Sequence, residues 1–360
     1  MSKITLERYF YPVGQGLCCR ERFISEQGQE FNLVYDCGQI DFWMNPRPAK
    51  YISKRIEQCF KDVKIDVLYI SHFHTDHINL LSYIEKSKGC CVKNVILPYL
   101  TERELLLNVI DNQVANNENT KRLLLKASGE LTEEEETKYY LLQSPEQDVK
   151  NGEFFIHNGE DLLQKIPLKR ILPFWKYLPF NNCKGMEKSI FSYLTNNLKN
   201  INPYDAKDVI NHKTKIREIY DNLGLGADLN EQSTLLLSLP EVSCIKKYSC
   251  QNRKYISEDN LIGCIYFGDY PAQKTPIPNR IEKVITNNLC YVGTIQIPHH
   301  GACNGELPNH YYIDKKCPVS YGFKKNYPTI FIVDTILKNK GMLICVNEYI
   351  EYFQHFEFEV

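Results

Sequence analysis

The chain has 360 residues and carries 43 Lys and Arg against 44 Asp and Glu, which gives a formal net charge of −1. This balance excludes a surface that is basic throughout, as general nucleic-acid-binding proteins have, although it leaves room for a local basic groove. No apolar run reaches the roughly 18 residues of a membrane-spanning helix, and the length allows one large core with space for an insertion.

The 14 cysteines are scattered along the chain. Several, including Cys37, Cys264 and Cys345, stand in apolar, strand-like runs, and no CxxC pair occurs. This usage favours reduced, buried cysteines in a cytoplasmic protein over a disulfide framework or a cysteine-rich zinc site. Residues Met1–Thr5 also lack the apolar segment of a signal peptide. We therefore expect a cytoplasmic location.

The first predicted elements alternate apolar and polar residues. Residues 3–40 are predicted to form a hairpin, with residues 14–16 at its turn and residues 31–35 as its second strand. Apolar residues at helical spacing then predict a helix over residues 49–62.

A cluster of metal-binding residue types follows the next strand. The apolar run Ile65–Ile70 predicts a buried strand that ends at Ser71, and directly after it comes the hexad His72-Phe73-His74-Thr75-Asp76-His77. Imidazole nitrogens and a carboxylate oxygen suit a borderline divalent metal such as Zn, with Mn or Fe as alternatives. The His-x-His spacing in an extended loop points both rings the same way, and Asp76 and His77 turn toward a second position. A His-rich polar loop without metal is the weaker alternative.

The middle of the chain changes in character. Residues 79–86 are predicted to form a helix and residues 91–99 a strand. Residues 101–150 are charged and favour helix, with helices predicted over residues 102–110 and 120–127. We interpret this stretch as an insertion over one side of a sheet.

The second half returns to strands. Residues 151–180 are strand-like, and residues 185–222 are predicted to form two further helices. Further strands are predicted over residues 233–239, 261–267 and 294–297. We therefore expect a single domain over residues 1–360, in which the range 101–222 includes helical insertions near the mouth of the metal site.

Five further motifs accompany the predicted strands. They are Val13-Gly14-Gln15-Gly16, Val34-Tyr35-Asp36-Cys37-Gly38, Asn230-Glu231-Gln232-Ser233, Ile265-Tyr266-Phe267-Gly268-Asp269 and Ile297-Pro298-His299-His300-Gly301. With the hexad, and in this order, they make the chain resemble the metallo-β-lactamase superfamily, and within it the ComEC-like branch of hydrolases, as a stand-alone version. The resemblance implies an α/β fold, the four-layered αββα sandwich with a helical insertion, and a metal-dependent hydrolase. It does not name a substrate, because one fold serves many reactions.

The same resemblance implies roles for individual residues. The implied metal ligands are His72, His74, Asp76, His77, Asp269 and His300. Of these, Asp76 and Asp269 are the implied catalytic carboxylates, and Asp269 is expected to bridge two ions. Asp36 is expected to orient a ligand histidine by a hydrogen bond. Residues expected to orient ligands or to contact substrate are His299, Asn230 and Ser233.

Two departures from the family pattern bear on the number of ions. Many members place a ligand histidine between the hexad and the bridging carboxylate, where this chain has the segment 230–233. The ComEC-like branch also has a histidine near the C-terminus, and the matching segment Gly322–Pro328 has none. One metal position therefore lacks a protein ligand, so we expect one or two divalent ions per chain, with Zn favoured.

From these motifs we expect hydrolysis of phosphodiester bonds, in DNA, a nucleotide or a related small molecule, by a metal-bound hydroxide. One alternative is hydrolysis of a thioester, lactone or amide at the same site. Another is a degenerate, non-catalytic interaction protein, against which the intact hexad and Asp269 argue. The expected partner is a phosphodiester-containing substrate, with DNA among the candidates; no membrane partner is expected, and no residue identifies a partner protein.

Overall fold

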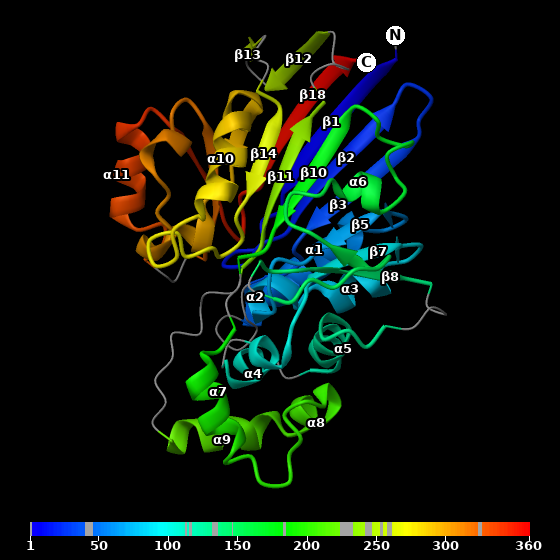
Figure 1. Ribbon diagram of the computed structural model, residues 1–360. Coiled ribbons are helices and arrows are strands. Elements are labelled where there is room, and N and C mark those ends of the chain that lie inside the picture. The colour runs from blue at the N-terminus through cyan, green and yellow to red at the C-terminus, as the bar shows by residue number, and fades with distance from the viewer. Residues whose placement is uncertain are drawn as a thin grey trace.

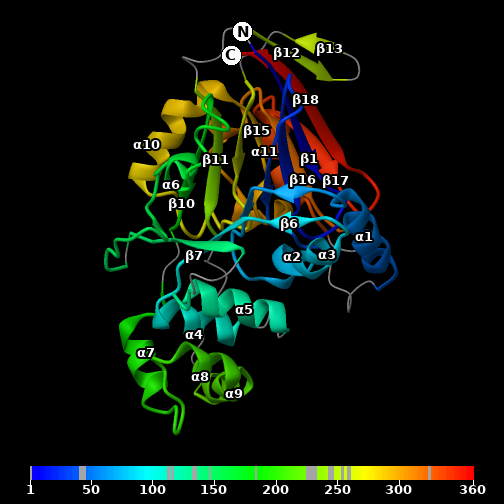
Figure 2. The same cartoon turned by 90° about the vertical axis from the view of Figure 1, so that its right-hand side faces the viewer.

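Two β-sheets lie face to face between two layers of helices in the computed structural model of the protein (Figures 1 and 2). The structure describes residues 2–39, 46–111, 114, 117–131, 136–145, 147–182, 185–223, 233–241, 247–252, 255–257, 261–322 and 326–360. Because helices enclose two stacked sheets, the predicted α/β fold with an αββα sandwich is confirmed.

The larger sheet contains the strand that leads into the hexad. Within the described residues its spatial order is β13 (Tyr255–Ser257), β12 (Lys247–Asn252), β18 (Tyr352–Glu359), β1 (Lys3–Phe10), β2 (Cys19–Ser25), β3 (Glu30–Tyr35), β5 (Val67–Tyr69), β7 (Asn94–Pro98), β8 (Lys138–Leu142) and β9 (Phe155–Ile156). The strands from β13 to β3 are antiparallel, and those from β3 to β9 are parallel. The parallel strands are buried almost throughout, because helices cover their outer face.

The smaller sheet contains the strands that lead into the other motifs. Its spatial order is β10 (Trp175–Phe180), β11 (Leu235–Pro240), β14 (Gly263–Tyr266), β15 (Val292–Ile295), β16 (Lys316–Ser320) and β17 (Met342–Val346). The last four of these strands run parallel. A short parallel pair, β4 (Lys64–Ile65) and β6 (Cys91–Val92), lies apart from both sheets.

Helices form the outer layers. The larger sheet is covered by α1 (Pro46–Cys59), α2 (Thr75–Ile78), α3 (Leu81–Lys86), α4 (Glu102–Ile110) and α5 (Glu118–Ala127). The smaller sheet packs against α10 (Asn279–Asn288) and α11 (Ile330–Lys338). Four more helices are α6 (Leu162–Lys165), α7 (Lys188–Thr195), α8 (Ala206–Asn211) and α9 (Lys213–Asn222). No helix in the described part of the chain is both long and apolar enough to cross a membrane.

The N-terminal region differs from the predicted hairpin. It forms three strands, because the segment Cys19–Ser25 is itself the strand β2 between β1 and β3. The segment carries Arg20 and Glu21, which are charged yet 7% and 0% exposed. Two buried charges hide the apolar alternation by which a strand is recognised in a sequence.

The range 101–150 is also less uniform than predicted. Its residues Lys138–Leu142 form β8 inside the larger sheet, since the run Tyr-Tyr-Leu-Leu fits a buried strand better than a helix. The range 185–222 holds three helices, α7, α8 and α9, in place of the two expected. These three helices gather beside α4 and α5 at one end of the molecule (Figure 1).

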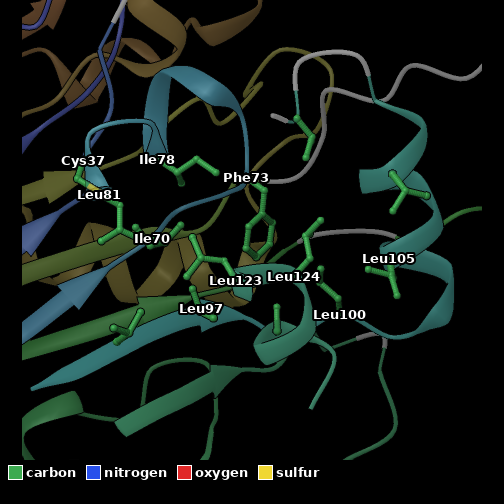
Figure 3. Close-up of a cluster of buried hydrophobic side chains, with 14 of the residues drawn as sticks. Cys37, Ile70, Phe73, Ile78, Leu81, Leu97, Leu100, Leu105, Leu123 and Leu124 are labelled. Carbon is green, nitrogen blue, oxygen red and sulfur yellow. The ribbon is translucent and has the colours of Figure 1, made fainter. Parts of the chain in front are cut away.

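The leucines of α4 and α5 pack on the outer side of the larger sheet. Leu105, Leu106 and Leu123 belong to a cluster that also contains Ile70 and Phe73, the latter from the hexad (Figure 3). The space between the two sheets is filled by a different cluster. We infer that apolar contacts anchor the helical insertion to the loop formed by the hexad, His72–His77, called the metal loop below for its candidate ligands. That the insertion borders the mouth of a site at this loop stays our proposal.

A stack of tyrosines joins the two sheets beneath the hexad. The ring of Tyr35 stacks on Tyr69 at a centroid distance of 5.2 Å and on Tyr266 at 4.8 Å. Tyr35 Oη donates to the carbonyl of Thr234 at 2.9 Å, and Tyr69 Oη to that of Leu235 at 3.2 Å. Because each buried hydroxyl has an acceptor on the other sheet, these contacts hold the strand ends of both sheets in register.

A buried ion pair joins the sheets farther from the hexad. Arg8 and Glu21 are both fully buried, and Arg8 Nε lies 2.7 Å from Glu21 Oε1. The guanidinium also donates to Gln354 Oε1 at 2.9 Å and to the carbonyl of Ile262 at 3.0 Å. Glu21 accepts hydrogen bonds from three hydroxyls of the smaller sheet, those of Tyr177, Ser238 and Tyr266. Both charges are thus satisfied without water, which is the condition for burying an ion pair.

Candidate metal centre

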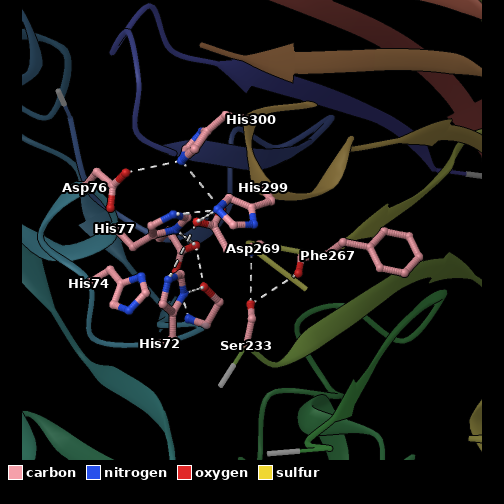
Figure 4. Close-up of polar contacts among 12 residues, drawn as sticks. His72, His74, Asp76, His77, Ser233, Phe267, Asp269, His299 and His300 are labelled. Carbon is pink, nitrogen blue, oxygen red and sulfur yellow. Dashed lines mark hydrogen bonds and ion pairs between the residues drawn. The ribbon is translucent and has the colours of Figure 1, made fainter. Parts of the chain in front are cut away.

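Loops from both sheets bring the predicted residues together. The hexad follows β5, Asp269 follows β14, and the pair His299 and His300 follows β15. Since the carboxyl ends of these parallel strands meet at one edge of the sandwich, the side chains converge there (Figure 4). Alternation along the extended hexad puts His72 and His74 on the side of the site, while Phe73 points into the apolar cluster of Figure 3.

Two groups of donors lie at this edge. Among the described residues, the metal-binding atoms of His72, His77 and Asp269 are all within 4.8 Å of one another, and so are those of Asp76, His77 and His300. His77 is common to both groups, and Asp269 approaches both, since Asp269 Oδ1 lies 3.1 Å from His77 Nε2 and 3.6 Å from His300 Nε2. Five of the six predicted ligands therefore stand together.

Asp36 contacts His77 directly, and its implied role of orienting a ligand histidine stays a prediction. Asp36 Oδ2 lies 2.8 Å from His77 Nδ1 and accepts a hydrogen bond from Ser71 Oγ at 2.7 Å. The Ser71 amide donates to Asp36 Oδ1 at 2.7 Å. Because a carboxylate only accepts, His77 carries a proton on Nδ1 and turns Nε2 toward Asp269. Burial alone would lower the pKa of His77, but the carboxylates of Asp269 and Asp36 outweigh it and raise that pKa well above its ordinary value.

Two imidazole nitrogens face the centre beside Asp269. The Nε2 atom of His72 is buried and makes no hydrogen bond to any described residue, whereas His77 Nε2 is paired with Asp269. Asp269 oxygens lie 4.0 Å from the first nitrogen and 3.1 Å from the second. Burial, together with the neighbouring His77 and His74, holds the pKa of His72 well below its usual range, so its ring is neutral and can offer a lone pair. A buried polar atom without a hydrogen-bond partner is costly, so the orientation of His72 Nε2 toward the centre indicates a ligand.

The second histidine of the pair His299 and His300 belongs to the donor group. His300 Nε2 lies 3.2 Å from Asp76 Oδ2, and its Nδ1 lies 2.9 Å from the Ser320 carbonyl, which accepts the ring proton. His299 is more exposed, and its Nε2 is 4.0 Å from Asp269 Oδ2. The structure thus places His300 within a candidate donor group and His299, whose side chain is 20% exposed, beside it.

The backbone is strained at three of these residues. Asp36, His299 and His300 have φ values of 54°, 49° and 55°, in the left-handed region that side chains other than glycine rarely occupy. Each such residue costs on the order of 1–3 kcal/mol, and such strain clusters at functional sites. The three residues lie at the site: Asp36 contacts His77, His300 belongs to a donor group, and His299 lies beside Asp269.

Ser233 holds the strand end that carries Asp269. Its Oγ donates to the Phe267 carbonyl at 3.2 Å and accepts the Asp269 amide at 3.1 Å (Figure 4). Gly268 lies between these residues with φ of +56°, and a Cβ there would come within 2.5 Å of Ser233 Oγ. The Ser233 side chain therefore fixes the backbone of Asp269. Asn230, with which it was paired in the sequence, falls outside the described residues, as do residues 323–325 of the C-terminal motif.

His74 stands apart from both donor groups in the described part of the chain. Its ring lies beside that of His72, with a centroid distance of 4.5 Å, and its Nε2 is 3.0 Å from Asp111 Oδ2. Its Nδ1 is buried without a hydrogen-bond partner among the described residues. Asp111 was not predicted, since it follows the amphipathic helix α4 and belongs to no motif.

The donor set fits a divalent cation. Imidazole nitrogens and carboxylate oxygens are the ligands of Zn and its neighbours, and here they converge in two groups that are buried except for the partly buried Asp76. Each buried imidazole of His77 and His300 is held through Nδ1 by a hydrogen-bond partner, as metal-binding histidines are.

Comparison with known proteins yields structural likenesses only. No family model matches the chain, and no curated protein matches it. Among solved structures it is similar to a long form RNase Z from yeast, with 10% identity, a TM-score of 0.34, and coverage of 97% of this chain and 37% of that one. It is also similar to the metallo-β-lactamase fold protein YhfI from Bacillus subtilis, with 10% identity, a TM-score of 0.34, and coverage of 98% and 99%.

A third likeness is to MEM-A1, a subclass B3 metallo-β-lactamase isolated from a soil metagenome library. Here the identity is 11%, the TM-score 0.27, and the coverage 81% of this chain and 79% of that one. The chain thus spans just over a third of the RNase Z and most of the other two. Scores this low leave the fold to be judged from the strand order and the layers of Figures 1 and 2.

Proposed function

We propose that the protein is a metal-dependent hydrolase of phosphodiester bonds, acting on DNA, a nucleotide or a related small molecule. One observation carries the hydrolase assignment: two donor groups share His77, and Asp269, a member of the first, also lies 3.6 Å from His300 of the second. The preference for phosphodiesters rests on the motifs that resemble the ComEC-like branch, among them the segment Ile297–Gly301.

The residues that would hold the cation or cations are those of the two donor groups, with His74 as a further ligand through Nδ1. A divalent cation bound there lowers the pKa of a water molecule to about 7 and neutralises charge that develops on the substrate. Zn is favoured by the nitrogen-rich set, with Mn or Fe as alternatives and one or two ions per chain.

The remaining residues position these groups. Asp36 and Ser71 keep His77 and the start of the hexad in place, and Ser233 keeps Asp269 at the strand end. Burial lowers the pKa of His299, so this partly exposed ring is neutral near pH 7 and suited to donate a hydrogen bond to a phosphoryl oxygen. Positioning of this kind is the main contribution a protein makes to phosphoryl transfer.

Purified protein is expected to carry at least one transition-metal ion per chain. The His72→Ala plus His74→Ala double variant is expected to lose it, because two imidazoles on one loop disappear. Elemental analysis of both proteins checks this. His310, which is exposed and paired with Glu282, provides the control His310→Ala, which should keep the metal. Wild-type protein that is metal-free and binds no added Zn or Mn would contradict the proposal.

Activity is expected against a bis-phosphodiester reporter in the presence of Zn or Mn, and not against a thioester reporter. Both reporters are assayed with each metal and with a chelator. Hydrolysis of the thioester alone would agree with the proposed metal site but contradict the proposed phosphodiester substrate. Tight metal binding without any hydrolysis would favour a non-catalytic interaction protein.

A further inference from the structure

The carboxylate of Asp111 makes a contact with the metal loop that no sequence motif indicates. Asp111 is 6% exposed, and its Oδ2 lies 3.0 Å from His74 Nε2. A carboxylate only accepts, so the shared proton stays on Nε2 in the neutral ring and Nδ1 keeps the lone pair. That Nδ1 is the buried atom without a hydrogen-bond partner among the described residues.

The position of Asp111 is electrostatically unfavourable for the helix that carries it. Asp111 is the C-terminal cap of α4, where its amide bonds to the Leu107 carbonyl. The C-terminus of a helix carries partial negative charge, so an acidic side chain there is destabilising by some tenths of a kcal/mol. An acidic residue that destabilises its own helix and is nevertheless buried must gain stability from another contact. The hydrogen bond to His74 is such a contact.

Helix α9 holds this turn in place. Arg217 donates from Nε to the Ile110 carbonyl at 2.9 Å and from Nη2 to the Asp111 carbonyl at 2.7 Å. Lys213 Nζ donates to the Val114 carbonyl at 2.7 Å, and Val114 forms a β-bridge with His74. The helical insertion is thus connected to the metal loop by polar contacts on both sides of Asp111.

We propose that Asp111 is a positioning residue of the metal centre, which fixes the tautomer and orientation of His74 so that Nδ1 is offered to the cation. The helices α4 and α9 then form part of the site's support. This inference rests on the proposed function, since it needs a cation bound by the hexad. Orienting partners of this kind typically contribute 10- to 100-fold to metal affinity.

The test measures Zn affinity of the metal-free full-length protein by competition with a chromogenic chelator. Asp111→Asn is expected to weaken binding by about 10- to 100-fold, because an amide can donate to Nε2 and so move the ring proton to Nδ1. The matched control is Asp205→Asn, in the same insertion. Asp205 caps α8 by accepting the amides of Lys207 and Asp208, and asparagine caps equally well, so its affinity should equal that of the wild type.

A double variant separates positioning from general structural support. In a His74→Ala background, Asp111→Asn should cause no further loss of Zn affinity, because the effect passes through the missing ring. An equal loss with and without His74 would overturn the proposal. So would wild-type affinity in Asp111→Asn.

A measurement on the wild type removes dependence on how the variants fold. In metal-free protein labelled with ¹⁵N-histidine, long-range ¹H–¹⁵N spectra should show the proton of His74 on Nε2, with the signal assigned by its loss in His74→Ala. A proton on Nδ1 would overturn the proposal. If the wild type binds Zn and His72→Ala does not, while Asp111→Asn binds normally, this inference fails and the proposed function stands. If the wild type binds no metal, the proposed function fails first.

Discussion

Asp269→Asn is expected to lower the rate of hydrolysis by at least about a hundredfold at every metal concentration. Asp269 approaches both donor groups, at 3.1 Å from His77 Nε2 and 3.6 Å from His300 Nε2. The amide keeps the shape but removes the charge from both groups, and a positioning error of about 1 Å can by itself cost a hundredfold in rate. Rates measured over a series of Zn and Mn concentrations check this.

Asp76→Asn is expected to behave differently in the same series. Asp76 contacts only one group among the described residues, through His300 Nε2 at 3.2 Å. Its loss weakens one site, and weak binding can be overcome by mass action, so added metal should restore part of the activity. The exposed Asp334→Asn on α11 serves as the control and should leave the rate unchanged.

The comparison of the two variants has informative alternatives. Equal loss in both, without rescue by metal, would indicate two tightly coupled ions of similar affinity. Full activity in Asp269→Asn would remove its bridging role, and with it the proposed arrangement of the site.

Arg8→Met is expected to lower the free energy of unfolding by about 3–5 kcal/mol. The substitution leaves Glu21 as a fully buried charge without its cation. It also leaves Gln354 and the Ile262 carbonyl without the guanidinium donor. Urea unfolding followed by circular dichroism measures the change, and an unaltered dependence on denaturant would show that the unfolded state is unaffected.

The control uses the same substitution at an exposed ion pair. Arg22 pairs with Glu30, and their side chains are 30% and 39% exposed. Water screens such a pair, so Arg22→Met should change the free energy of unfolding by no more than about 1 kcal/mol. Equal losses of unfolding free energy in Arg8→Met and Arg22→Met would contradict the inference that burial makes the pair of Arg8 and Glu21 more stabilising than an exposed pair.

Local sequence was sufficient to predict a donor-rich loop at the end of a buried strand, while the sandwich was expected from the resemblance of the ordered motifs to a known superfamily. Apolar runs end where donors begin, so a strand leading into a polar loop is visible without any tertiary contact, as for β5 and the hexad or β14 and Asp269. The alternation of an extended chain likewise predicts that His72 and His74 share one side while Phe73 takes the other. These inferences depend on neighbours within a few residues.

Only the tertiary structure decides how His74 is held and how the two sheets are joined. Asp111 is 37 residues from His74, and Arg8 is 346 residues from Gln354. Polar pairs at such separations leave no period in the sequence, and the buried charge of Glu21 even conceals the strand that carries it. Their strength also arises only after folding, because a hydrogen bond or ion pair becomes strong when the stacked sheets and the helical insertion remove it from water.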